Sequence, residues 1–138
     1  MAKMVLLEPY VEINAVDRSS SVSKIEFDDQ FEEKETTTFG SSSAKEVLGG
    51  LESGSVAITF KNDYAAGALD SAMWALRRSL VTIKARPVAA SIVSSANPQY
   101  SCSILINNWK PIAGTVGDVA EVDVTYPMSG VLARATTT

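Results

Sequence analysis

The stretch GGLESGSVAITFKNDYAAGALDSAMWALRR, residues 49–78, predicts a strand, a turn and a helix in succession. In residues 55–60, Val56, Ile58 and Phe60 alternate with small or polar residues, which is the period of two typical of a half-buried strand. From residue 65 to 78 the apolar positions recur at spacings of three and four, as they do along one face of a helix. We expect this strand face to be buried together with the helical stripe Leu69, Met73 and Leu76.

The ends of the predicted helix carry charges that suit its dipole. Asp63 precedes the first turn, and Arg77 and Arg78 fall in the last one. Within the same unit, Tyr64, Met73 and Trp74 admit two interpretations, a ligand-binding box or part of the core. We interpret them as core, because aromatic residues at helical spacing usually pack against the rest of the fold.

Alternating or apolar segments separated by turn residues predict further strands on both sides of this unit. With residues 55–60 they make about seven strands, the others lying near residues 10–16, 22–27, 80–86, 100–109, 119–126 and 131–135. The sequence therefore predicts a mainly β fold, a two-sheet β-sandwich or barrel with one flanking α-helix at about residues 65–78. We expect a single domain over residues 1–138, with extended N- and C-terminal arms.

Two connections between these strands have features of their own. A long loop is expected at about residues 39–50, with one helical turn at 44–48 that the glycines at 49 and 50 end. A turn is expected at residues 127–130, before the short last strand.

The most charged segment is residues 28–35, DDQFEEKE, where five carboxylates accompany one lysine. One interpretation is a solvated edge whose charges prevent promiscuous strand pairing. The other is a surface that repels polyanions. A calcium site is disfavoured, because the segment has neither the spacing nor the central glycine of an EF-hand loop.

The sequence has few of the residues and motifs that catalysis commonly uses. It contains no histidine and only one cysteine, Cys102, which lies in an apolar strand and is interpreted as a buried thiol. The commonest general base and the commonest metal ligand are therefore missing. The glycines at 49, 50 and 54 form no phosphate-binding pattern. We predict that the protein is not an enzyme, with no catalytic residues, no cofactor and no bound metal.

Net charge and hydropathy limit the kinds of partner that the sequence favours. The formal net charge is −4, which argues against tight, phosphate-driven binding of DNA. No apolar run approaches the roughly 18 residues of a membrane-spanning helix. We expect a soluble protein that is made in the cytoplasm and does not insert into a membrane.

Several short motifs, in this order, resemble the tail tube (major tail) proteins of long-tailed bacteriophages. Trp74 follows Asp63 by eleven residues within this series. The motifs are ETTTFG (35–40), GLESGSV (50–56), DYAAG (63–67), ANPQY (96–100), GTVGD (114–118), VTYPMSG (124–130) and RAT (134–136). The likeness extends over nearly the whole chain from Tyr10 onward.

The resemblance implies a structural subunit of a virion tail. Such subunits close as six-membered rings that stack into a hollow tube for DNA, and their inner sheets join into one barrel across subunits. The implied partners are other copies of the chain, the tape measure, tail tip and terminator proteins, and DNA that passes transiently and without specificity. An acidic, polar lumen would repel phosphates and let DNA slide.

Two groups of residues are candidates for these roles. The polar strand faces predicted to line the lumen are Glu121, Asp123, Thr125, Glu26 and Asp28. The loop at 39–50 and the two ends, 1–9 and 129–138, are predicted to form contacts between subunits and rings. The residues chosen for these contacts are Phe39, Ser41, Ser42, Lys45, Glu46, Leu48, Leu6 and Arg134.

Two alternatives stay open. One is another virion assembly protein, such as a capsid decoration protein or a tail terminator, since these share small β domains. The other is a small β-sandwich ligand-binding module, which an exposed aromatic cleft around Tyr64, Trp74 and Trp109 would favour.

Overall fold

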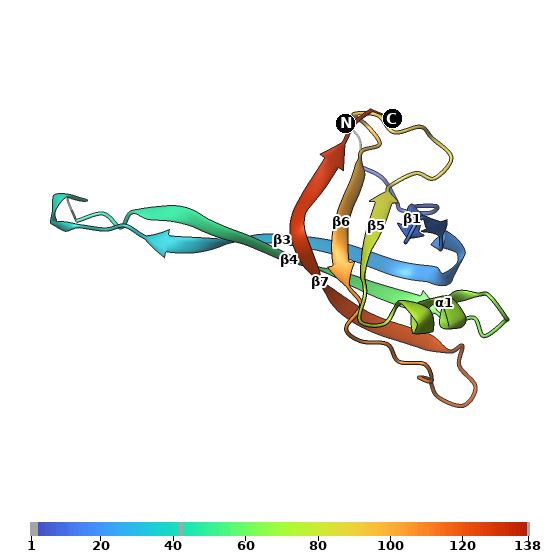
Figure 1. Ribbon diagram of the computed structural model, residues 1–138. Coiled ribbons are helices and arrows are strands. Elements are labelled where there is room, and N and C mark those ends of the chain that lie inside the picture. Colours follow the sequence, from blue (N-terminus) through green and yellow to red (C-terminus); the bar gives the residue numbers. More distant parts are fainter. Residues whose placement is uncertain (1–2, 42, 138) are drawn as a thin grey trace.

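The computed structural model describes residues 3–41 and 43–137 and has a mainly β fold with seven strands and one α-helix among them (Figure 1). The strands are β1 (Tyr10–Ile13), β2 (Val16–Asp17), β3 (Val22–Glu35), β4 (Val47–Lys61), β5 (Leu80–Arg86), β6 (Gln99–Leu105) and β7 (Glu121–Ala135). The helix is α1 (Leu69–Leu76), and single 3-10 turns occur at Ser19–Ser21 and Phe39–Ser41. The predicted fold class is confirmed, and so is the number of about seven strands. The predicted strand at 10–16 is, however, two strands that turn at Asn14 and Ala15, and those predicted at 119–126 and 131–135 are one strand, β7.

The strands form one antiparallel sheet in the order β2-β1-β5-β6-β7-β4-β3. Strand β7 belongs to both halves of it, because residues 121–127 pair with β4 and residues 128–135 pair with β6. β7 bends between these two sets of partners, so the halves fold over one another as two layers (Figure 1). The expected two sheets are therefore two layers of one continuous sheet.

The predicted turn at residues 127–130 is wrong, because the chain continues there as strand. Pro127, opposite Ser55, is the last residue of β7 that pairs with β4, and the next residue pairs with β6. Proline is tolerated in a sheet where the ladder ends or is irregular. A register shift between β6 and β7 follows, so β7 bends without breaking. Residues 129–135 consequently lie in the sheet and form no extended arm.

The core lies between the two layers and is closed at one side by α1. Val56, Ile58 and Phe60 are fully buried, as the alternation predicted. Leu69 and Met73 of α1 are buried as well, and Leu76 packs against them in part. The remaining core comes from β1, β5, β6, β7 and the segment after β6, with Val11, Ile13, Val81, Ile83, Ala85, Cys102, Ile104, Ile106, Trp109, Val122, Val124 and Tyr126.

Trp109 joins the helix to the sheet. Its indole Nε1 donates a hydrogen bond of 3.1 Å to Asp70 Oδ1 on α1. Its ring meets Phe60 edge to face, with ring centroids 5.7 Å apart. Trp109 is thus buried between the helix and the sheet.

The helix is shorter than predicted at both ends. Residues 65–68 form a turn, in which the Ala68 N–H donates to the Ala65 carbonyl at 3.0 Å. At the other end Arg77 leaves the helical conformation with φ −55° and ψ 141°. Arg78 then takes a positive φ of 68°. The two arginines therefore follow the helix, and Asp70 is the acidic residue of its first turn.

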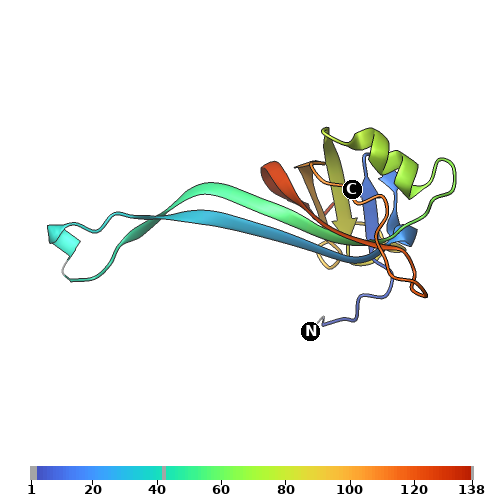
Figure 2. The same ribbon diagram turned by 90° about the horizontal axis from the view of Figure 1, so that it is seen from below.

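The hairpin of β3 and β4 extends far beyond the sheet. β4 pairs with β7 only from Ser55 onward, and the rest of the hairpin projects away from the body of the molecule (Figures 1 and 2). We call residues 29–54 the arm. The predicted helical turn at 44–48 and the break at the glycines are wrong, since Val47, Leu48 and Gly49 pair with Glu35, Lys34 and Glu33.

Candidate functional site

The outer face of β3, β4 and β7 brings together all five residues predicted to line a lumen. Residues that pair across antiparallel strands point to the same face of the sheet. Glu26 pairs with Ala57, which in turn pairs with Thr125. In the same way Asp28 lies opposite Ser55, Asp123 opposite Thr59, and Glu121 opposite Lys61. We call this surface the polar face.

The polar face lies on the side of β3, β4 and β7 that faces away from the core. In β7, Val122, Val124 and Tyr126 are buried, whereas Glu121, Asp123 and Thr125 between them are exposed. In β3, Ile25 and Phe27 pack partly against the core, and Glu26 points outward. The alternation of the two strands was therefore sufficient to place these carboxylates.

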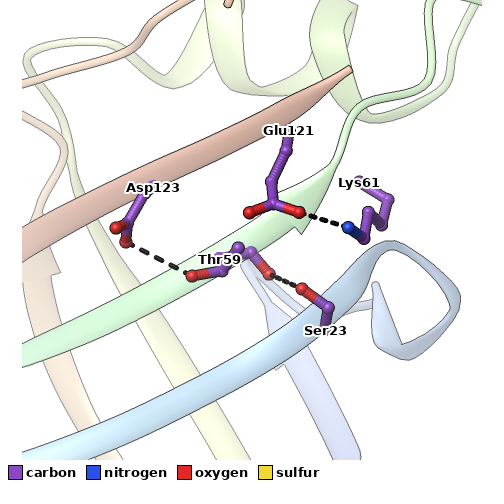
Figure 3. Close-up of polar contacts among 5 residues, drawn as sticks. All are labelled: Ser23, Thr59, Lys61, Glu121 and Asp123. Carbon is purple, nitrogen blue, oxygen red and sulfur yellow. Dashed lines mark hydrogen bonds and ion pairs between the residues drawn. The ribbon is translucent and has the colours of Figure 1, made fainter. Parts of the chain in front are cut away.

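Two carboxylates of this face, those of Glu121 and Asp123, contact polar neighbours (Figure 3). Lys61 Nζ forms an ion pair with Glu121 Oε2. Thr59 Oγ1 donates a hydrogen bond of 3.3 Å to Asp123 Oδ1, and the Thr59 carbonyl accepts one of 3.2 Å from Ser23 Oγ. Lys110 Nζ reaches the Asp123 carbonyl at 3.1 Å.

Sequence reasoning missed the lysines of the polar face. Lys24 is paired with Thr59 and Lys61 with Glu121, so both lie among the carboxylates. The signal was available, because Lys24 and Lys61 keep the same alternation as Glu26 and Thr59. Four carboxylates and two lysines make the face acidic but mixed in sign. Within residues 3–41 and 43–137, no cluster of three or more His, Cys, Asp or Glu side chains is placed to hold a metal ion.

The second candidate group is divided between three places. Phe39, Lys45, Glu46 and Leu48 lie on the outer part of the arm and are exposed. Ser41 belongs to the 3-10 turn at its end, and Ser42 lies outside the described residues. Leu6 lines an apolar pocket of about 120 Å³ with Pro9, Ile25, Phe27 and Tyr100. Arg134 is in β7, where its Nε donates to Tyr100 Oη at 3.2 Å.

The end of the arm is ordered by its own polar contacts. The Thr36 N–H donates to the Glu46 carbonyl at 2.9 Å, and the Glu46 N–H donates to Thr37 Oγ1 at 2.9 Å. Lys45 Nζ lies 3.5 Å from Glu33 Oε1, which links the segment before β4 to β3. The arm therefore has a defined end without a hydrophobic core of its own.

Large apolar side chains on the arm have no cover. Phe31 is 62% exposed and Leu51 74% exposed, and Phe39 is fully exposed. Sequence reasoning did not single out Phe31 or Leu51. Because their neighbours are charged residues and glycines, they show no periodic face that would mark them as apolar contacts.

The aromatic residues proposed for a ligand-binding cleft do not meet. Trp109 is buried and Tyr64 and Trp74 are about half exposed, so the core interpretation of these two is wrong. Tyr64 Oη donates to the Pro111 carbonyl at 2.7 Å, whereas Trp74 is stacked against Arg77. The pocket beside Trp109 is lined by neither of the other two.

Neither a protein-family model nor any characterised protein matches the chain in sequence comparisons. In the part of the chain that the structure describes, no helix has the length and apolar character needed to cross a membrane.

Proposed function

We propose that the protein is the structural subunit of a bacteriophage tail tube, which assembles with copies of itself into stacked, hexameric rings around a channel for DNA. The observation that carries the proposal is the arm. It projects from a well-packed body and exposes both its faces and its largest apolar side chains, so a single copy leaves it uncovered. Exposed apolar surface of this kind marks contacts with other protein surfaces.

The motifs in the sequence supply the specific identity within this class. Two of them, ETTTFG and GLESGSV, form the end and the returning strand of the arm. A third, VTYPMSG, spans the bend of β7 that joins the two layers. The resemblance to tail tube proteins thus falls on the features that give this fold its shape.

The polar face is proposed to line the channel. It is continuous over three strands, carries more carboxylates than lysines, and lies opposite a complete core. Phosphates approaching this face would meet net repulsion. The chain would reach its final location in the virion tail, with the tape measure, tail tip and terminator proteins as further partners.

Electron microscopy of the purified protein tests the assembly. Hollow tubes or stacked rings are the expected result. A persistent monomer at high concentration contradicts the proposal, and isolated trimers would indicate a capsid decoration protein instead.

A charge reversal tests the channel assignment separately. In Glu26→Lys with Asp123→Lys, we expect tubes to form but DNA delivery to fall, since the channel would attract phosphate. The matched control is Asp63→Lys with Asp118→Lys, which makes the same change in charge at exposed residues outside both candidate groups. Equal infectivity of particles carrying either pair would overturn the assignment of the polar face.

A further inference from the structure

A pocket of about 280 Å³ lies beyond the end of α1 and gathers two arginines. Its lining consists of Arg77, Arg78, Ile106, Asn107, Asn108 and Trp109, and we call it the arginine pocket. Arginine and asparagine both present N–H donors, and guanidinium groups bind carboxylates in a fixed, two-pronged geometry. The chemistry of the lining therefore suits a carboxylate.

One of the arginines is held in place before any partner binds. The guanidinium of Arg77 lies 3.4 Å from the centre of the Trp74 ring, and its Nε donates to the Trp74 carbonyl at 3.1 Å. The stacked, hydrogen-bonded side chain has less conformational freedom to lose when an anion arrives.

Arg78 occupies a backbone position that favours glycine. Its φ of 68° is in the left-handed region, where a Cβ atom is unfavourable and where glycine commonly follows a helix. The conformation is fixed by the Arg78 N–H, which donates to the Ile106 carbonyl at 2.7 Å. An arginine that is kept in a strained position points to a role for its side chain.

Neither arginine has a carboxylate partner of its own. The ion pairs of the described residues involve Lys34, Lys45, Lys61 and Lys84, and none involves Arg77 or Arg78. Two arginines therefore line one pocket without a carboxylate partner among the described residues.

The arm carries the complementary charge. Its six carboxylates and two lysines give it a net charge of −4, equal to that of the whole chain, so the remainder is neutral. The lysines pair with Glu32 and Glu33, so four carboxylates have no cation among the described residues, namely Asp29, Glu35, Glu46 and Glu52. Of these four, Glu35 and Glu46 lie nearest the end of the arm, and both are exposed. These two lie close together, since Glu35 pairs with Val47 at the start of β4.

We propose that the arginine pocket binds the Glu35 and Glu46 carboxylates at the end of the arm of a second copy of this chain. The arm leads away from the body and from α1 in both views, so a chain does not place its own arm in its own pocket (Figures 1 and 2). The proposal rests on the proposed function only in requiring that copies associate. It names the two charged groups through which they do so.

The variant Arg78→Gly distinguishes a loss of the proposed contact from a loss of folding stability. Glycine removes the guanidinium and relieves the positive φ, so we expect the melting temperature to rise while self-association weakens about tenfold. Both are measured on the full chain, by thermal unfolding and by sedimentation velocity over a range of concentrations. Unchanged or tighter association of this variant overturns the proposal.

Charge exchange identifies the partner. Arg77→Glu with Arg78→Glu should weaken association, and so should Glu35→Arg with Glu46→Arg. All four changes in one chain should restore it, because the same pairs form with their signs reversed. Failure of the fourfold variant to recover, while the melting temperature of each variant stays near that of the wild type, contradicts the proposal.

The outcomes distinguish this proposal from the proposed function. Tubes that form equally well with every variant leave the tail tube intact and exclude the arginine pocket. If association depends on the arginines but gives a closed oligomer without tubes, the arginine pocket is supported and the tail tube is excluded. If duplex DNA binding falls in Arg77→Glu with Arg78→Glu while self-association is unchanged, the pocket binds phosphate and the proposal is wrong.

Discussion

The β3–β4 hairpin has an inner half in the body and an outer half in the arm. The two halves have similar backbone pairing, but the inner half packs on a core and the outer half is exposed to solvent. In the body, Val56, Ile58 and Phe60 are completely buried against the second layer. On the arm, Phe31 and Leu51 belong to the same two strands and remain mostly exposed. The comparison teaches that pairing continues well past the point where the core ends. The outer half is therefore held by its ladder of hydrogen bonds and a few ion pairs, whereas the inner half is held by burial.

The strongest test of this contrast compares two phenylalanines. Phe60→Ala should lower the free energy of unfolding by about 3–5 kcal/mol, because it leaves a cavity in the packed core. Phe31→Ala, on the arm, should change it by less than about 0.5 kcal/mol. Urea denaturation of both variants gives the two values. A large loss in Phe31→Ala would show that the arm packs against its own chain.

The junction between body and arm is tested by two glycines. A Cβ atom at Gly54 would lie 2.4 Å from the Asp28 carbonyl oxygen and 2.8 Å from Met128 Sδ, so Gly54→Ala forces the backbone to move. We expect a loss of about 2 kcal/mol. Gly49→Ala is the control, since its Cβ would meet nothing within 4 Å. Equal urea midpoints for the two variants would mean that the junction is not tightly packed.

A smaller effect, of opposite sign, is expected in the core. Tyr126 is fully buried, and its hydroxyl has no hydrogen-bond partner among the described residues. Tyr126→Phe should therefore raise the free energy of unfolding by about 1 kcal/mol at neutral pH. A loss of stability in this variant would indicate a partner for the hydroxyl.

The same tyrosine gives a pH dependence. Burial raises the pKa of the Tyr126 hydroxyl above its ordinary value of 10.0. The folded state keeps the proton after the unfolded chain has lost it, so stability falls as the pH rises above 10.0. Tyr126→Phe should lose less stability over that range than the wild type. Thermal unfolding at pH values on both sides of 10.0 makes the comparison.

The smallest effect is expected on the arm. Glu33→Gln breaks the ion pair with Lys45, in which both side chains are more than half exposed. Exposed ion pairs contribute little to stability, so the free energy of unfolding from urea denaturation should change by no more than about 0.5 kcal/mol. A larger shift, persisting in high salt, would require a buried contact at this position.

The body was predictable from sequence because the alternation of apolar and polar residues along its strands matches the alternation of buried and exposed side chains. The alternation in residues 55–60 and 80–86 placed every inward side chain correctly. The polar face followed from the same alternation in β3 and β7. Helix length was less accessible, since the end of α1 depends on the backbone of Arg78, which is tied to Ile106. A tertiary hydrogen bond of this kind leaves no local signal.

The arm and the bend of β7 could not be predicted for different reasons. Gly49 and Gly50 are ordinarily strand breakers, but on the arm Gly50 lies close to Glu32 and Lys34, where a larger side chain would crowd them. Pro127 is tolerated because β7 changes partner immediately after it. In both places the pairing across the sheet overrides the preference of the single residue.

The position of β7 in the chain has a consequence for the order of events during synthesis. It is the last strand of the sheet along the sequence, and it alone joins β4 to β6. Until residues 121–135 have left the ribosome, the two layers lack the strand that connects them, and the core between them stays open. Contacts this distant in sequence form slowly, so the nascent chain carries its exposed arm before it has a finished body. An incomplete chain, with its core open and its arm exposed, is therefore at risk of aggregation.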